Sequence, residues 1–155
     1  IHHRAPGPVI AALRDPRIWI EVINDGVHVH PAVVRSLFEE ASERMVLVTD
    51  AMAATNSPDG HYLLGELDVE VKDHVARLVD GGNIAGSTLT MDRAVARSIT
   101  AVGVPLDVAV AAATSHPAAA INLEDSYGRL AEGYPADFLV LDPETFLPTD
   151  IHTSF

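Results

Sequence analysis

Two short, mostly apolar runs in the first third of the chain each lead into polar residues. Met45–Val48 is apolar at every position, which is typical of a strand buried on both faces of a parallel sheet, and Asp50 follows it. Trp19–Ile23 is a second strand candidate, and the polar stretch Asn24–His30 comes after it. Because the carboxyl ends of parallel strands meet at one edge where ligands collect, we expect these polar residues to face a common crevice. From its position alone, Asp50 is equally well interpreted as the cap of a following helix or turn.

Apolar residues at helical spacing predict several helices. A helix beginning at Pro31 places Val34, Leu37, Phe38 and Ala41 on one buried face. Further helices are predicted over Pro8–Leu13, Asp92–Val102, Leu106–Ser115 and Ala118–Leu123. The dipeptide His116-Pro117 is expected to separate the last two helices. His116 is interpreted as a residue at a helix end and not as a metal ligand.

A change to strict alternation marks the predicted β-structure. Leu67–Lys72 alternates apolar and polar residues, Asp73-His74 reverses the chain, and Val75–Val79 returns, which together predict an antiparallel hairpin. The preceding segment, residues 53–62, is rich in turn residues and is predicted to be a loop over the strand ends. Near the C-terminus, Asp137–Leu141 is a predicted strand, and Thr145–Phe155 could add an edge strand.

Two of these connecting segments carry candidate chemistry. In the first, Gly26 permits a tight turn, and His28 and His30 alternate along an extended stretch, so that only one of them can face the site. In the second, Ile84–Ser87, a glycine and a hydroxyl are suited to hydrogen bonding with a ligand. An ordinary Ser/Thr cap for the next helix is an equally good interpretation of that segment.

Composition narrows the classes of function. The chain has 155 residues, 48% of them hydrophobic, and a formal net charge of −12, which argues against nucleic acid or an anionic membrane as partner. Cysteine is absent, so metal could be held only by histidines and carboxylates, and a cytoplasmic location is favoured. No apolar run approaches the ~20 residues of a membrane span. The N-terminal residues resemble neither a signal peptide nor the start of a domain, so we expect the chain to begin within a larger fold.

The motifs, taken in order, carry a resemblance to a known family. HHRAPG, DGVHVHP, LVTDAMAAT, AGSTLTM, ATSHPAAAINL and GRLAEGYPADFLVLD resemble the C-terminal part of the N-acetylglucosamine-6-phosphate deacetylases, in the amidohydrolase superfamily. The resemblance covers nearly the whole chain. The combination of DGxHxHP, VTDA and AGSxLTM is specific to these deacetylases, whereas GxLxxGxxAD is shared across the superfamily.

This resemblance implies an α/β fold, namely the C-terminal portion of a (β/α)8 barrel plus strands of a small β-sandwich domain. Residues 1–127 would hold the last barrel strands and helices, with a β-hairpin at about 62–80, and residues 128–155 the C-terminal strands of the small domain. The glutamate and two histidines that hold the catalytic metal in the family would lie upstream, with a Thr-His motif just before Ile1. His2 and His3 are therefore not expected to be metal ligands.

The resemblance also implies an activity and a set of site residues. The activity is metal-dependent removal of the acetyl group from N-acetylglucosamine 6-phosphate, which gives glucosamine 6-phosphate and acetate. Asp50 would be the catalytic acid/base and can also contact a second metal ion, and Arg4 would bind the sugar phosphate. The other expected substrate-binding residues are Asp25, Gly26, Val27, His28, Ile84, Ala85, Gly86 and Ser87.

The same resemblance implies a divalent metal as cofactor, and the family usually forms homodimers. Zn²⁺ is the first choice, with Fe²⁺ or another divalent ion as alternatives, and residues outside this chain would bind most of it. Two alternative functions stay open. One is deacetylation of N-acetylgalactosamine 6-phosphate, and the other is a non-catalytic fragment that binds sugar phosphate. Taken alone, the chain is expected to lack activity.

Overall fold

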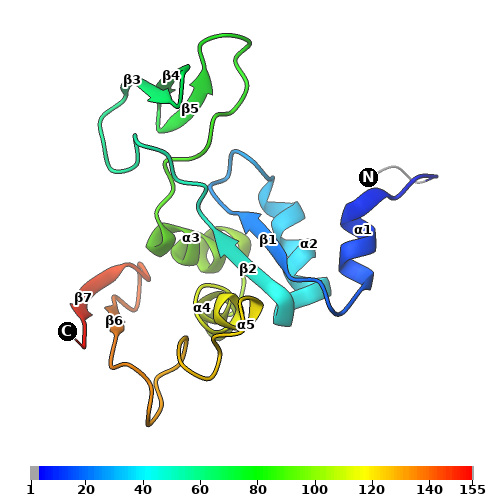
Figure 1. The fold of residues 1–155 in the computed structure, drawn as a ribbon, viewed down its shortest axis with the longest axis vertical. Coiled ribbons are helices and arrows are strands. Elements are labelled where there is room, and N and C mark those ends of the chain that lie inside the picture. The colour runs from blue at the N-terminus through cyan, green and yellow to red at the C-terminus, as the bar shows by residue number, and fades with distance from the viewer. Residues whose placement is uncertain (1–3, 155) are drawn as a thin grey trace.

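A pair of parallel strands lies at the centre of the computed structural model, which describes residues 4–154. β1 (Ile20–Ile23) pairs with β2 (Met45–Val48), with Ile20 opposite Met45 and Ile23 opposite Val48. The first three residues of β2 are buried, with at most 4% of their surface exposed. This confirms the prediction of a strand that is covered on both faces. The strands lie side by side in Figure 1, and both point toward the same end of the molecule.

Helices cover the two strands and complete one core. They are α1 (Gly7–Arg14), α2 (Pro31–Ala41), the 3-10 turn Ser42–Arg44, α3 (Met91–Arg97), the π-helical turn Ser98–Val102, α4 (Leu106–Ala111) and α5 (Ser115–Ala120). Val34 and Phe38 from α2 and Ala94 and Val95 from α3 pack in the same buried cluster as Met45. α1, α2, α3 with the π-helical turn that follows it, and α4 were predicted within a few residues, whereas the turn Ser42–Arg44 was not predicted and α5 differs from its prediction. No helix in the described range is both long and apolar enough to cross a membrane.

The dipeptide His116-Pro117 lies inside the first turn of α5 and does not interrupt it. The predicted helix Ala118–Leu123 is therefore wrong in its position, because the helix begins at Ser115 and ends at Ala120. Proline fits the first turn of a helix, where its missing N–H has no intrahelical partner to lose. The ring Nδ1 of His116 lies 2.8 Å from the carbonyl oxygen of Met45, so this histidine links α5 to β2, in agreement with a structural role.

A small antiparallel sheet stands apart from the core, above it in Figure 1. It has the order β3-β4-β5, formed by Gly60–Leu64, Leu67–Lys72 and Val75–Leu78. The predicted hairpin is confirmed by β4 and β5, and its turn residues Asp73 and His74 have φ of 51° and 61°. The loop predicted for residues 53–62 ends earlier than expected, because pairing with β4 extends the chain from Gly60 onward.

Two further strands form a separate sheet near the C-terminal end. β6 (Phe138–Leu141) and β7 (Pro148–His152) pair antiparallel, as expected for both segments. Phe155, at the end of the predicted edge strand, lies outside the described residues. Leu139 is 49% exposed and Ile151 is 66% exposed, so this sheet is only partly covered within residues 4–154.

The side chain of Arg44 ties α1 to the start of β2. Its guanidinium donates hydrogen bonds of 2.5 to 3.3 Å to four carbonyl oxygens, those of Ala12, Leu13, Asp15 and Ile18. These include the C-terminal carbonyls of α1, which have no partners within the helix. The C-terminal end of α1 is therefore anchored beside the start of β2.

Candidate active site

Asp50 lies two residues beyond β2, at the edge where both central strands end. Its φ is +50°, in the left-handed region that aspartate tolerates better than most residues. The side chain is exposed, and within residues 4–154 its carboxylate accepts no hydrogen bond. The residues after it form a single β-bridge and turns, so the structure does not use Asp50 as a helix cap. The carboxylate is therefore available to a ligand.

Ser87 holds the backbone on both sides of Asp50. Its N–H donates to the carbonyl of Asp50 at 2.8 Å, and its own carbonyl accepts from Met52 N–H at 2.9 Å. Its hydroxyl donates a short hydrogen bond to the carbonyl of Thr49 and accepts from Leu89 N–H at 3.0 Å. Ser87 is only 2% exposed. These hydrogen bonds fix the conformation of the segment that carries Asp50, and the hydroxyl forms a local turn with Leu89 instead of capping α3.

The residues just before Ser87 connect the small sheet to Asp50. Ala85 N–H donates to the carbonyl of Ala76 in β5, and Ile84 forms a bridge with Arg77. Gly86 has φ of +68°, and a Cβ atom there would lie 3.1 Å from the carbonyl oxygen of Asp50. A glycine is therefore needed for this close approach. The segment predicted to close over the sugar lies directly against the Asp50 backbone.

Asp25 and His28 form a hydrogen-bonded pair after β1. One carboxylate oxygen of Asp25 accepts from Val27 N–H and His28 N–H, at 2.8 and 2.9 Å, and the other lies 2.7 Å from the ring Nδ1 of His28. The side chains are 13% and 20% exposed for Asp25 and His28. Burial acts to raise the pKa of Asp25, but these hydrogen bonds together outweigh it and hold the pKa below its ordinary value. Asp25 is therefore a carboxylate that is fully engaged with its own turn.

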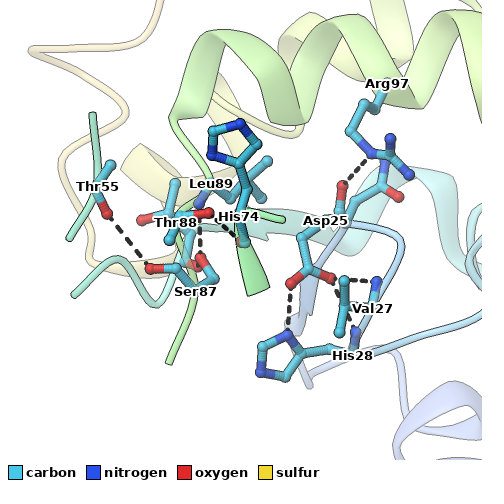
Figure 2. A network of polar contacts seen from close by, with 11 residues as sticks. Asp25, Val27, His28, Thr55, His74, Ser87, Thr88, Leu89 and Arg97 are labelled. Carbon is cyan, nitrogen blue, oxygen red and sulfur yellow. Dashed lines mark hydrogen bonds and ion pairs between the residues drawn. The ribbon is translucent and has the colours of Figure 1, made fainter. Parts of the chain in front are cut away.

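A second layer of contacts supports this turn from α3. Arg97, labelled beside this turn in Figure 2, donates from Nε to the carbonyl of Asn24 at 3.1 Å. The buried Asn24 side chain donates to Ser98 Oγ at 3.0 Å. Gly26 has φ of +83°, and a Cβ there would lie 2.1 Å from Nη2 of Arg97. Gly26 thus leaves room for an arginine. Sequence reasoning missed Arg97 and Asn24; the position of Asn24 directly after a strand was the available signal, whereas Arg97 had none.

The other residues singled out in the sequence are Val27, Arg4 and three further histidines. Val27 is 37% exposed beside His28, and Arg4 is exposed in the segment before α1. His30 caps α2, its ring Nδ1 accepting from Ala32 N–H at 3.2 Å, so only His28 of the two alternating histidines pairs with Asp25. His2 and His3 lie outside the described residues.

The side chains present do not by themselves form a complete metal centre. Among residues 4–154, no three histidine, aspartate or glutamate side chains gather as a ligand set. A catalytic zinc site normally uses three protein ligands. Asp50, with an exposed and unengaged carboxylate, can supply one ligand or accept a proton beside such a centre.

Comparison with known proteins identifies the class. The amidohydrolase family profile matches residues 3–155, and the chain belongs to this family. A solved structure of a Mycobacterium smegmatis N-acetyl-D-glucosamine-6-phosphate deacetylase variant, in complex with N-acetyl-D-glucosamine 6-phosphate, superposes with a TM-score of 0.92 at 41% identity. It covers 99% of this chain, and the chain covers 41% of it. The expected fold, part of an amidohydrolase barrel with additional strands, is thereby confirmed.

Two relatives named as sugar-phosphate deacetylases are similar to the chain over most of its length. The chain is 43% identical to N-acetylgalactosamine-6-phosphate deacetylase of Escherichia coli O157:H7, over 92% of this chain and 37% of the relative. It is 40% identical to N-acetylglucosamine-6-phosphate deacetylase of Vibrio furnissii, over 93% of this chain and 36% of the relative. The chain therefore spans little more than a third of these relatives. The predicted resemblance to the deacetylases is confirmed.

Proposed function

We propose that this chain is part of a metal-dependent deacetylase that converts N-acetylglucosamine 6-phosphate to glucosamine 6-phosphate and acetate. The observation that carries the proposal is the exposed Asp50 carboxylate at the end of a buried parallel strand, held by Ser87 and free of hydrogen bonds within the described range. The solved relative with N-acetyl-D-glucosamine 6-phosphate bound supports the same substrate class.

In this proposal, Asp50 takes a proton from the attacking water as the water adds to the acetamide carbonyl. It then gives a proton to the nitrogen of the departing amine, so the C–N bond breaks without release of an amide anion. Amidohydrolases generally use divalent metal ions, which activate water and polarise carbonyl groups. Zn²⁺ is our first choice, with Fe²⁺ or another divalent ion as alternatives, and Asp50 would contribute at most one ligand.

The decisive experiment is Asp50→Asn in the full-length enzyme. Asparagine keeps the shape but cannot accept the proton, so kcat should fall by about 10² to 10⁴ while KM changes little. Asp68→Asn is the matched control, because Asp68 is an exposed carboxylate on β4 whose side chain makes no hydrogen bond to any residue in the range 4–154. An Asp50→Asn enzyme within threefold of the parent refutes the assignment. A full-length parent without deacetylase activity on any sugar phosphate would favour the non-catalytic alternative.

Arg4 is proposed to bind the phosphate of the substrate. Removing this cation with Arg4→Gln should weaken the phosphorylated sugar much more than the unphosphorylated N-acetyl sugar, because only the phosphate forms charge-assisted hydrogen bonds with it. Equal losses for both sugars would show that Arg4 supports its loop instead. Sizing of the variant must accompany the assay, since we propose a cytoplasmic homodimer and loss of the dimer would lower both activities.

N-acetylgalactosamine 6-phosphate is the second candidate substrate. The relative that carries this name is 43% identical, slightly more than the N-acetylglucosamine-6-phosphate deacetylase of V. furnissii. The two sugars differ only in the orientation of one hydroxyl, so the ratio of their kcat/KM values decides between them. We further propose residues 1–127 as the barrel portion and 128–155 as the portion in the small β domain.

A further inference from the structure

We infer that Asp25 acts on the ligand through His28, as a positioning residue that fixes the proton on Nδ1 and presents Nε2 to the substrate. Sequence reasoning expected both residues to line the sugar site. The inference deepens the proposed function, since it assigns the two residues different tasks. It depends on that function only for the identity of the ligand.

Both oxygens of the Asp25 carboxylate already have hydrogen-bond partners within the protein. One oxygen accepts two backbone N–H groups, from Val27 and His28, and the other faces Nδ1 of the same histidine at 2.7 Å. An ionised carboxylate can only accept hydrogen bonds, and the lowered pKa of Asp25 keeps it ionised near neutral pH. Nδ1 must therefore carry a hydrogen. With 13% of its side chain exposed, the carboxylate has little surface left for a sugar.

This arrangement leaves Nε2 as the atom through which His28 meets a ligand. Figure 2 shows this second ring nitrogen turned away from Asp25 and from the Arg97 side of the turn. In the neutral ring, Nε2 carries a lone pair and accepts a hydrogen bond from a sugar hydroxyl. In the protonated ring, the same atom donates to an oxygen of the substrate. In both charge states Nε2 contacts the ligand from the same position, because the Asp25 carboxylate holds the His28 ring in one orientation.

The turn that holds Asp25 is itself anchored to α3. Arg97 donates to the carbonyl of Asn24, and Asn24 donates to Ser98, whose hydroxyl in turn donates to Ala94 at 2.8 Å. Asn24 and Ser98 are fully buried. The pair is thus supported by a chain of hydrogen bonds that leads from the helix to the residue directly before Asp25, as expected of an outer layer that orients a functional side chain.

The test is the tautomer of His28 in the full-length enzyme, read by nitrogen NMR of ¹⁵N-histidine-labelled protein at a pH where the ring is neutral. His28→Gln identifies its signals. The wild type should show a protonated Nδ1 and an unprotonated Nε2. Asp25→Asn should shift the population toward the Nε2–H form and lower kcat/KM by ten- to a hundredfold. Asp68→Asn is the matched control, because Asp68 is an exposed carboxylate on β4 that does not line the hollow beside Asp25. It should leave the tautomer unchanged and kcat/KM within twofold of the parent.

The outcomes separate this inference from the proposed function. A wild-type His28 in the Nε2–H form overturns the inference, whatever the variants do, and so does an unchanged tautomer in Asp25→Asn. If the enzyme deacetylates no sugar phosphate, the proposed function fails while the NMR result still decides the role of Asp25. If Asp25→Asn does not fold, the wild-type spectrum alone provides the test.

Discussion

Gly26→Ala should destabilise the protein through two separable effects. The first is the backbone, because φ of +83° is unfavourable for alanine by about 1 to 2 kcal/mol. The second is Arg97, whose Nη2 lies 2.1 Å from the position of the new Cβ, so the guanidinium must move and its hydrogen bond to Asn24 is lost. A hydrogen bond from a charged group contributes about 1.5 to 3 kcal/mol, and partial exposure of Arg97 reduces this to about 1. The expected total is about 2 to 3 kcal/mol.

Urea unfolding of the full-length protein measures this loss, and two further variants separate the effects. Gly133 has φ of +89° and open space around it, so Gly133→Ala reports the backbone cost alone, about 1 to 2 kcal/mol. In an Arg97→Ala background, Gly26→Ala should cost no more than Gly133→Ala, because the obstructing side chain is gone. The double-mutant cycle should therefore show a coupling of about 1 kcal/mol.

Either of two results would refute this reasoning. If Gly26→Ala costs the same with and without Arg97, the arginine does not lie against Gly26, and the proposed support of the Asp25 turn from α3 fails with it. If Gly26→Ala equals Gly133→Ala in the parent background, the same conclusion follows from an independent comparison.

Three further predictions follow from the other contacts. Arg44→Met leaves four carbonyl oxygens without their charged partner and should lower the free energy of unfolding by about 2 to 4 kcal/mol in urea titrations, whereas a loss under 0.5 kcal/mol would contradict the anchoring role. Ser87→Ala frees the backbone around Asp50 and should lower kcat about tenfold with little change in KM; an equal effect on both constants in steady-state assays would speak against it. Asp25, with its lowered folded pKa, stabilises the protein above the ordinary value of 3.8, and this contribution is lost as pH falls through the folded value. The urea midpoints of the parent and of Asp25→Asn are measured against pH. Below pH 3.8 the midpoint of the parent should fall more steeply than that of Asp25→Asn, and parallel curves would contradict a stabilising Asp25 carboxylate.

Patterns local in the sequence determined most of the elements. The apolar residues at every position of Met45–Val48 predicted a strand buried on both faces. Apolar residues at helical spacing predicted α2. The turn Asp73-His74 followed from the alternation on both sides of it. Motif order also indicated the family, since the spacing of several short motifs is a property of the sequence alone. The strand, helix and turn depend on neighbours within a few residues, and the motif order can be compared along the sequence, so neither required the tertiary structure.

Only the tertiary structure showed which protein atoms the predicted site residues contact. Asp25 and Ser87 are predicted to bind the sugar, and the structure adds that each also forms hydrogen bonds with protein atoms. Arg97 lies 73 residues from Asn24 in the sequence, and no local pattern connects them. β3 was not predicted, because the composition of its segment favours turns. The segment is extended because it pairs with β4. Hydrogen bonds between distant segments depend on how the elements pack, and the packing is set by the whole fold.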